Sequence, residues 1–200
     1  MTRLGILLSG RGSNFETIAR NIAAGEIPGA EIAVVISNRP EAPGLEIAQQ
    51  LGLPAVSLPS RGIERVVYDR MLLEELTKAR VDLICLAGYM RLLSGTFTRE
   101  FPNRILNIHP SLLPAFPGLD AQHQAWQYGV KFTGCTVHFV DENLDSGPII
   151  LQAVVPVHDG DTADTLSVRI LEQEHRIYSE ALRIVVGGKY RIEGRRVITL

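Results

Sequence analysis

Leu4-Gly-Ile-Leu-Leu-Ser9 is a stretch of strand length without a polar residue before Ser9, and a glycine-rich turn and an amphipathic segment follow it directly. In that segment Phe15, Ile18, Ala19 and Ile22 recur at the spacing of one face of a helix. A strand without polar alternation that leads into a helix is typical of a parallel sheet covered on both faces. The stretch therefore predicts a β–α unit at the start of an α/β fold.

Further units of this kind follow in the first half of the chain. Apolar runs predict strands over residues 31–37, 55–58, 82–87 and 104–108. Helices are predicted over residues 44–51 and 63–79, and the longer one is expected to turn Val66, Val67, Met71 and Leu72 inward. Strands and helices that alternate in this way favour parallel pairing of the strands.

The pattern changes after His109, where residues 110–118 hold three prolines and are predicted to form a rigid loop. Beyond it we predict a helix over 119–128, strands over 133–140 and 148–157, a long helix over 162–186 and a hairpin over 190–199. The expected fold is α/β: a Rossmann-like, open, mostly parallel sheet with helices on both faces and extra strands in the C-terminal half. Residues 1–200 are expected to form a single domain, with a mononucleotide-binding-like half over 1–109 and a second half over 110–200.

Composition limits the classes of partner. The 20 Lys and Arg residues against 22 Asp and Glu residues give a net charge of −2, which provides no general attraction for nucleic acid or anionic membranes. No apolar run approaches the roughly 20 residues that span a bilayer, and the strand predicted at the start leaves no room for a signal peptide.

Cys85 and Cys135 stand in apolar runs and are predicted to be core residues in a reducing compartment. We expect a cytoplasmic protein with small-molecule partners and with neither a nucleic-acid nor a membrane partner; a homodimer is left open.

The turn Ser9-Gly-Arg-Gly-Ser-Asn14 suits an anion. Its glycines let the backbone turn tightly and approach a ligand, and Ser13 with Glu16 predicts a capping box that starts the helix. The first amides and the dipole of that helix favour a phosphate. A dinucleotide fingerprint would need glycine in place of Phe15, and the Gly-Lys-Ser/Thr of a P-loop is absent. A well-capped turn without a ligand is the alternative.

Arg104-Ile-Leu-Asn-Ile-His-Pro110 places two polar side chains at the end of a predicted strand. Asn107 and His109 are two residues apart, so they share one face of the strand. The carboxyl end of a parallel strand is where open α/β sheets bind their ligands. An amide and an imidazole together suit a carbonyl oxygen that becomes an oxyanion. A histidine whose hydrogen bonds are satisfied at the strand end is the alternative.

Asp141-Glu-Asn-Leu-Asp-Ser-Gly-Pro148 supplies carboxylates able to orient His109. Its spacing resembles a calcium loop, but Ser146 and Gln152 stand where such a loop needs glycine and glutamate. A solvated turn is the alternative. The sequence has no HExxH, CxxC or GxSxG motif, so neither a zinc site nor a serine hydrolase is predicted. The remaining histidines are scattered and, taken singly, need no functional explanation: His123, His138, His158 and His175.

Three motifs occur in one order: Ser9 to Asn14, Asn107-Ile-His-Pro-Ser-Leu-Leu-Pro114, and Asp141 through Leu144-Asp-Ser-Gly-Pro148. Together they resemble the phosphoribosylglycinamide formyltransferases, a family of folate-dependent enzymes, over nearly the whole chain. The two later motifs are typical of formyltransferases in general, and the glycine-rich turn narrows the resemblance to the enzymes that act on glycinamide ribonucleotide. The resemblance implies transfer of a formyl group from the co-substrate 10-formyltetrahydrofolate to the amine of glycinamide ribonucleotide in de novo purine synthesis, without a metal or a covalent intermediate.

The resemblance also implies the site residues. For the phosphate and ribose of the substrate they are Gly12, Ser13, Asn14 and Glu174. For the folate, with residues 110–200 as the folate-pocket half, they are Arg65, Met90, Arg91, Leu92, Leu93, Asn107 and Asp141. The implied catalytic residues are Asn107, His109 and Asp145. Asn107 and His109 would stabilise the oxyanion, and Asp145 would support His109.

Three other functions compete with this one. A formyltetrahydrofolate deformylase would use water as the acceptor, but it has no use for the glycine-rich turn, and its N-terminal regulatory domain is not expected before a strand that starts at Leu4. A methionyl-tRNA formyltransferase would have a C-terminal domain for RNA, which we do not expect in a chain of net negative charge that stops at Leu200. A non-catalytic phosphate-binding module would have no reason to combine Asn107, His109 and Asp145.

Overall fold

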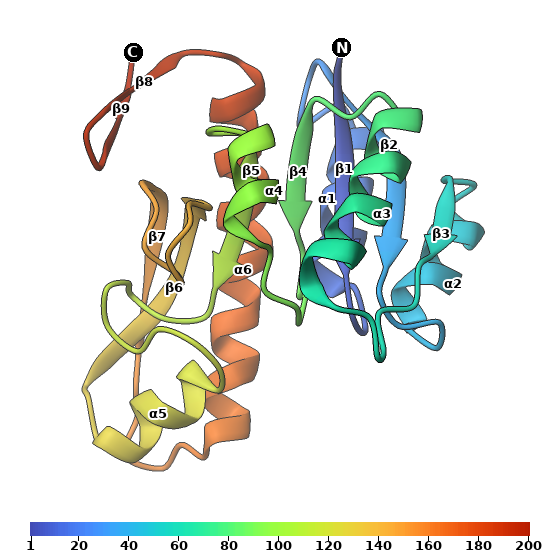
Figure 1. Ribbon diagram of the computed structural model, residues 1–200. Helices are drawn as coiled ribbons and strands as arrows, with labels where there is room; N and C mark the ends of the chain where they lie inside the picture. The colour runs from blue at the N-terminus through green and yellow to red at the C-terminus, as the bar shows by residue number, and fades with distance from the viewer. The chain divides into compact units, whose positions relative to one another are not determined.

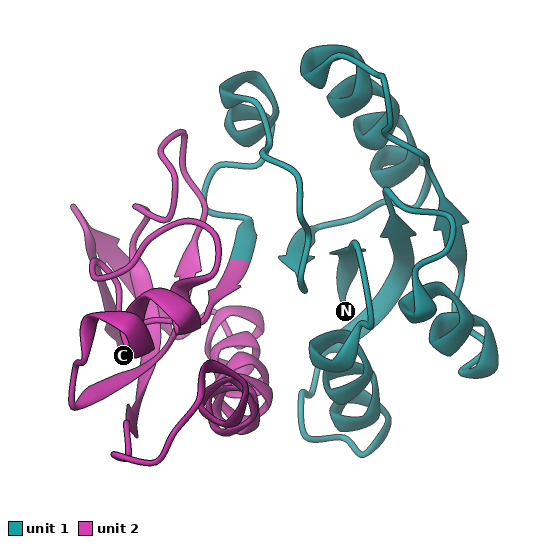
Figure 2. Ribbon diagram, turned by 90° about the horizontal axis from the view of Figure 1, so that it is seen from below, with its two compact units in different colours: residues 1–106 teal, residues 107–200 magenta.

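The computed structural model describes residues 1–200. They divide into two compact units, Met1–Leu106 and Asn107–Leu200, coloured teal and magenta in Figure 2. The division falls close to the predicted boundary between the two halves at residues 109 and 110. That the whole chain forms a single domain stays a prediction, and the units are described one at a time.

The first unit is a series of parallel strands joined by helices (Figure 1). Its elements, in chain order, are β1 (Thr2–Leu8), α1 (Ser13–Ala23), β2 (Ala30–Ser37), α2 (Pro43–Gln50), β3 (Ala55–Ser57), α3 (Arg65–Lys78), β4 (Leu83–Leu86), α4 (Gly95–Glu100) and the first residues of β5 (Ile105–His109). The strands stand in the order β3-β2-β1-β4-β5, and β1 pairs in parallel with both β2 and β4. The chain therefore starts in the middle of this sheet, and the predicted Rossmann-like α/β class is confirmed.

Helices cover both faces of this sheet, as Figure 2 shows for the first unit. A Cβ added at Gly5 of β1 would lie 2.8 Å from Leu76 of α3. Leu8 is three residues farther along the strand and therefore points to the opposite face, where it would lie 2.7 Å from a Cβ added at Gly44 of α2. Because both faces of β1 are covered, the strand is apolar without alternation, as its sequence predicts.

The inward face of α3 differs from the predicted one. Of the four residues expected to point inward only Leu72 is buried, and Val67 is 49% exposed. Tyr68 and Asp69 are buried instead. The tyrosine hydroxyl donates to a carbonyl oxygen before the helix (2.8 Å), and the carboxylate accepts from the amide of Ser94 (2.7 Å). Hydrogen bonds offset the cost of burying these polar groups, so the helix rotates relative to the face that its apolar residues alone predict.

The helix α4 is not predicted by the periodicity of the sequence. It has six residues, which is too short for an apolar repeat to become visible. Its start is nevertheless encoded locally, because the side chain of Ser94 accepts a hydrogen bond from the amide of Phe97 (3.2 Å).

The second unit holds the end of β5 and the antiparallel part of the fold. Its further elements are α5 (Ala121–Tyr128), β6 (Phe132–Phe139), β7 (Ile149–Pro156), α6 (Ala163–Val186), β8 (Tyr190–Glu193) and β9 (Arg196–Thr199). β6 and β7 pair antiparallel, β7 pairs in parallel with β9, and β8 and β9 form the predicted hairpin. The long helix α6 contacts β6, β7 and α5 (Figure 1). The extra strands and the long helix are where the sequence predicts them.

Both cysteines are buried and neither forms a disulfide, which confirms their prediction as core residues. Burial raises the pKa of the Cys135 thiol to about 12.

None of the helices combines the length and the apolar character that crossing a membrane requires.

Candidate active site

The turn after β1 adopts a conformation that differs from the predicted capping box. α1 begins at Ser13, and its N-cap is Gly12, whose φ of 78° lies in the left-handed region. The amide of Glu16 donates to the carbonyl oxygen of Gly12 (2.8 Å), and no side chain caps the helix. The capping box is wrong because it needs the serine at the N-cap, whereas the left-handed glycine makes Ser13 the first helical residue.

Gly12 and its surroundings leave no room for a side chain on one side of the turn. A Cβ added at Gly12 would lie 2.9 Å from the Cα of Gly44, in a backbone region that non-glycine residues avoid. The amide of Gly44 also donates to the carbonyl oxygen of Gly10 (3.1 Å). A Cβ added at Gly10, by contrast, would meet nothing within 4 Å. The turn is therefore packed on one side against α2, whereas the space beside Gly10 is open.

A chain of buried hydrogen bonds ties the end of β1 to the neighbouring strand ends. The hydroxyl of Ser9 donates to Oδ1 of Asn38 and accepts from the amide of Met90 (2.8 Å). Nδ2 of Asn38 donates in turn to the hydroxyl of Ser60 (3.1 Å). Ser9, Asn38 and Ser60 are all buried. These bonds fix the backbone of Met90, one of the predicted folate residues, beside the glycine-rich turn.

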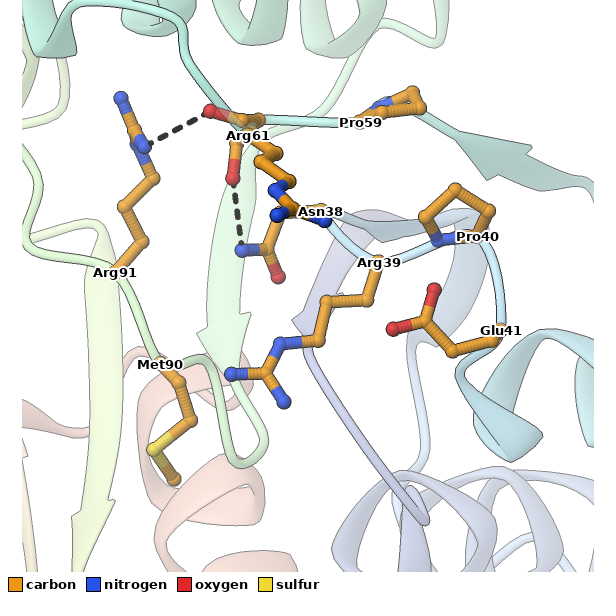
Figure 3. A pocket seen from close by; sticks show the side chains of 9 residues that line it. Asn38, Arg39, Pro40, Glu41, Pro59, Arg61, Met90 and Arg91 are labelled. Atoms are coloured by element: carbon orange, nitrogen blue, oxygen red, sulfur yellow. Dashed lines mark hydrogen bonds between the residues drawn. The ribbon is translucent and has the colours of Figure 1, made fainter.

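A pocket of about 580 Å³ opens at this edge of the first unit (Figure 3). Its lining includes Asn38, Arg39, Ser60, Arg61, Met90 and Arg91. The three arginines face a single acidic side chain, that of Glu41, and none of them forms an ion pair. A pocket with three guanidinium groups and one carboxylate suits an anionic ligand.

Arg91 is held in place by neutral partners. Its guanidinium donates to the carbonyl oxygens of Ile63 (2.8 Å) and Ser60 (3.4 Å), the second of which is dashed in Figure 3. It also lies 4.6 Å from the centre of the Tyr68 ring. Carbonyl oxygens and an aromatic face orient the cation without neutralising its charge.

The remaining predicted folate residues of the first unit lie elsewhere. Arg65 is the first residue of α3, is exposed and does not line this pocket. Leu92 is exposed and Leu93 is half-buried in the segment after β4, and neither lines the pocket. Met90 and Arg91 are therefore the predicted folate residues that the first unit brings together.

The second unit brings the predicted catalytic residues together. Asn107 and His109 stand in β5, and Asp145 lies in the loop after β6 with a left-handed φ of 48°. Oδ2 of Asp145 lies 3.4 Å from Nδ1 of His109, and the two side chains are only 9% and 5% exposed. The same oxygen accepts from the amide of Gly118 (2.8 Å). A carboxylate fixed at this distance stabilises positive charge that develops on the imidazole.

The proline-rich loop holds the other side of His109. Nε2 of the ring donates to the carbonyl oxygen of Phe116 (2.8 Å). The single proton of the Ser111 hydroxyl is directed mainly at the carbonyl oxygen of Ala115 (2.5 Å), and the oxygen of Phe116 lies farther away (3.2 Å). Both ring nitrogens of His109 therefore face oxygen atoms of the protein.

His138 of β6 is a site residue that the sequence does not reveal. Its Nε2 lies 3.2 Å from Nδ2 of Asn107 and 3.8 Å from Oδ1 of Asp145, and its side chain is 2% exposed. Burial lowers the pKa of His138 below its usual value of 6.5. Taken singly in the sequence, His138 needs no functional explanation, whereas the structure places it beside Asn107 and Asp145. The available signal was its position near the end of the strand that leads into the acidic loop.

Two further predicted residues are found in the second unit. Asp141 is half-buried, and its Oδ1 accepts from the amide of Asn143 (2.8 Å), a turn that shapes the acidic loop. Glu174 is buried on α6, near enough to Cys135 for its charge to add to the raised pKa of that thiol. The predicted residues thus form a group of glycine-turn and arginine residues in the first unit and a group of catalytic residues in the second.

Comparison with known proteins gives one consistent result. The family model described as formyl transferase matches residues 2–182. The chain is 47% identical over 190 residues to the trifunctional purine biosynthetic protein adenosine-3 of Drosophila melanogaster, covering 93% of this chain but only 14% of that protein. It is 39% identical over 194 residues to phosphoribosylglycinamide formyltransferase of Bacillus subtilis, covering 96% of this chain and 99% of that protein. Among solved structures, glycinamide ribonucleotide transformylase 1 of Symbiobacterium toebii matches with a TM-score of 0.97 and 54% identity, over 100% of this chain and 94% of that chain.

Proposed function

The chain belongs to the formyl transferase family, and from this premise we propose that it transfers the formyl group of 10-formyltetrahydrofolate to the amine of glycinamide ribonucleotide, a step of purine synthesis. The observation that carries the proposal is the meeting of His109 and Asp145, with Asn107 on the same strand as His109. The full-length similarity to phosphoribosylglycinamide formyltransferase of Bacillus subtilis supports the choice of acceptor.

The chemistry proposed is direct attack by the substrate amine. The amine nitrogen forms a bond to the formyl carbon, and the carbonyl oxygen takes up negative charge. The tetrahedral intermediate then collapses and breaks the bond between that carbon and N10 of the folate. The proton lost by the amine reaches N10, through water or through His109. The amine itself is the nucleophile, so the reaction requires neither a covalent enzyme intermediate nor a metal.

Asn107 and His109 are the proposed donors to the developing oxyanion. An N–H aimed at the place where charge develops lowers the barrier more than it stabilises the ground state. For His109 this requires an exchange of partners, because its Nε2 donates to the carbonyl oxygen of Phe116. When the ring turns to the substrate, the hydroxyl of Ser111, which donates mainly to the carbonyl oxygen of Ala115 (2.5 Å), would be the nearest side-chain donor left to the oxygen of Phe116 (3.2 Å). Asp145 would stabilise the positive charge of the ring during the transfer.

The binding roles follow the same division between the units. We assign the phosphate of glycinamide ribonucleotide to Gly12, Ser13 and Asn14 at the start of α1, where the amides and the dipole favour an anion. Glu174 is assigned to the ribose. The carboxylates of the folate are assigned to the arginine-lined pocket, through Arg91 and its neighbours. The remaining folate contacts proposed from the family resemblance are Arg65, Met90, Leu92, Leu93, Asn107 and Asp141.

A coupled assay tests the proposal. The purified chain receives both 10-formyltetrahydrofolate and glycinamide ribonucleotide, and loss of the formyl donor and formation of the formylated acceptor are followed together. We expect equal amounts of donor lost and acceptor formylated, and no loss of donor when the acceptor is omitted. Release of formate without the acceptor would support a hydrolase instead, and no consumption of donor in either case would exclude both activities.

A further inference from the structure

His138 is a buried histidine of the second unit that the proposed chemistry does not use. Its Nε2 lies 3.2 Å from the side-chain amide nitrogen of Asn107 (Nδ2), and its Nδ1 lies 2.9 Å from the backbone carbonyl oxygen of Phe139. The ring is thus held at both nitrogens by fixed groups. Phe139 is itself fixed at the end of β6, because its amide donates to the carbonyl oxygen of Pro148, the residue before β7 (2.9 Å).

The partner of Nδ1 determines which nitrogen of His138 carries the proton. A backbone carbonyl oxygen only accepts hydrogen bonds, so Nδ1 is the protonated nitrogen. A neutral imidazole has one donor and one acceptor, which leaves the lone pair on Nε2. The group 3.2 Å away must then be a donor, and the amide nitrogen of Asn107 is that group.

The surroundings of His138 keep the ring neutral. Burial lowers its pKa most, and the neighbouring His109 lowers it further, whereas the carbonyl oxygen of Phe139 and the carboxylates of Asp145 and Asp141 oppose this. The resulting pKa of His138 lies below its usual value of 6.5. A protonated ring would present an N–H to the amide nitrogen of Asn107, where two donors would face each other.

From this geometry we infer that His138 is a positioning residue, which holds the side-chain amide of Asn107 with its nitrogen toward the ring and so fixes the direction of the second N–H. An amide is nearly symmetric in shape, and a free Asn107 would be able to turn over. A turned amide would present its oxygen, which repels an oxyanion, in place of the N–H that stabilises it. The inference rests on the proposed function in so far as that N–H serves the formyl oxygen.

Two substitutions test the roles of the two ring nitrogens of His138 separately. His138→Gln places a side-chain oxygen where Nε2 stands and keeps an acceptor for Asn107. His138→Asn keeps a donor for Phe139 but removes the acceptor. We expect His138→Asn to lower kcat about 10-fold, the scale of one neutral hydrogen bond, and to leave both KM values within about twofold. His138→Gln should retain kcat within about threefold of the unsubstituted protein. Equal loss in both variants would overturn the inference.

A second substitution tests whether His138 acts through Asn107. In an Asn107→Ala background the amide is gone, so adding His138→Asn should change kcat by less than about twofold. The same 10-fold loss in that background would show that His138 acts on something else and would overturn the inference. Thermal unfolding of each variant distinguishes a lost fold from a lost orientation.

A spectroscopic measurement tests the inference without relying on activity. In the protein with ¹⁵N-labelled histidine, the His138 resonances are assigned by their loss in His138→Gln. We expect Nδ1 at the shift of a protonated nitrogen and Nε2 at that of an unprotonated one near neutral pH. A protonated Nε2 would overturn the inference whatever the enzyme transfers. Failure of the coupled assay with a spectrum as expected would instead overturn the proposed function alone.

Discussion

Oδ2 of Asp145 lies 3.4 Å from Nδ1 of His109 and at the same time accepts a hydrogen bond from the amide of Gly118 (2.8 Å). The amide comes from the proline-rich loop and the carboxylate from the acidic loop, so one oxygen atom links both loops to the imidazole. Because the backbone amide fixes the carboxylate, removing its charge can be separated from removing its position.

Asp145→Asn makes this separation. The asparagine oxygen is able to accept from Gly118, but the negative charge opposite His109 is gone. If the imidazole carries charge during the transfer, kcat should fall on the order of 10²–10⁴-fold with little change in either KM. Steady-state kinetics check this, and Asp159→Asn, at an exposed carboxylate paired with Lys131, is the matched control. A kcat within about threefold of the unsubstituted protein would remove Asp145 from the mechanism.

Asn107→Ala and His109→Ala remove the two proposed donors one at a time. Each should lower turnover on the order of 10²–10³-fold, as the loss of an oxyanion donor does. Turnover in the coupled assay measures the effect, and Gln127→Ala, which removes an exposed amide of α5, should leave it unchanged. Formylation near the unsubstituted rate in both variants would contradict the proposed mechanism.

Gly12→Ala tests the phosphate role of the glycine-rich turn. The added Cβ would lie 2.9 Å from Gly44 and would displace the first turn of α1. KM for glycinamide ribonucleotide should rise about 10-fold or more, the scale of a lost hydrogen bond to a charged group. The control is Gly25→Ala, because Gly25 has a similar φ of 75° but open space around its Cβ position. Both variants should lose about 1–2 kcal/mol of stability from the left-handed backbone. An equal KM for glycinamide ribonucleotide in both variants would argue against a phosphate role for the glycine-rich turn.

Arg91→Ala tests the arginine-lined pocket. The guanidinium is oriented by two carbonyl oxygens and the ring of Tyr68 and has no acidic partner, so a carboxylate of the folate would meet an uncompensated charge. KM for 10-formyltetrahydrofolate should rise about 10-fold while KM for glycinamide ribonucleotide stays constant. Arg70→Ala, at an exposed arginine of α3, is the control. A rise in KM for glycinamide ribonucleotide alone would assign the pocket to glycinamide ribonucleotide instead of the folate.

The lowered pKa of His138 predicts a pH dependence of stability. Above its usual value of 6.5 the ring is neutral in both the folded and the unfolded chain, so it contributes no dependence. As the pH falls below 6.5, the unfolded chain binds a proton that the folded chain resists, and the free energy of unfolding decreases. Between about pH 8 and about pH 5 the unsubstituted protein should therefore lose stability relative to His138→Gln, by up to about 1.4 kcal/mol per pH unit in the affected range.

Urea unfolding at several pH values measures this difference. His158→Gln, which removes an exposed histidine, should leave the pH dependence of the unsubstituted protein unchanged. Parallel stability curves for the unsubstituted protein and His138→Gln would show that His138 titrates alike in the folded and unfolded chains.

The elements of the fold are largely encoded in local patterns. The strands of the first unit are continuous apolar runs because both of their faces are covered, and α6 has a long amphipathic repeat. Both patterns act over a few residues and are visible in the sequence. The starts and faces of helices are less local. That Gly12 rather than Ser13 caps α1 depends on a left-handed turn packed against Gly44 of α2, and the inward face of α3 depends on partners for Tyr68 and Asp69 from other segments.

For the candidate site, the sequence by itself determined which residue types stand at the strand ends: a glycine turn after β1, an amide and an imidazole on one face of β5, and carboxylates after β6. Only the tertiary structure decided that Asp145 faces His109 and that His138 faces Asn107. A lone histidine in an apolar strand has no local pattern that separates a core residue from a site residue. Its role depends on which side chains the pairing of distant strands and loops brings within hydrogen-bond distance.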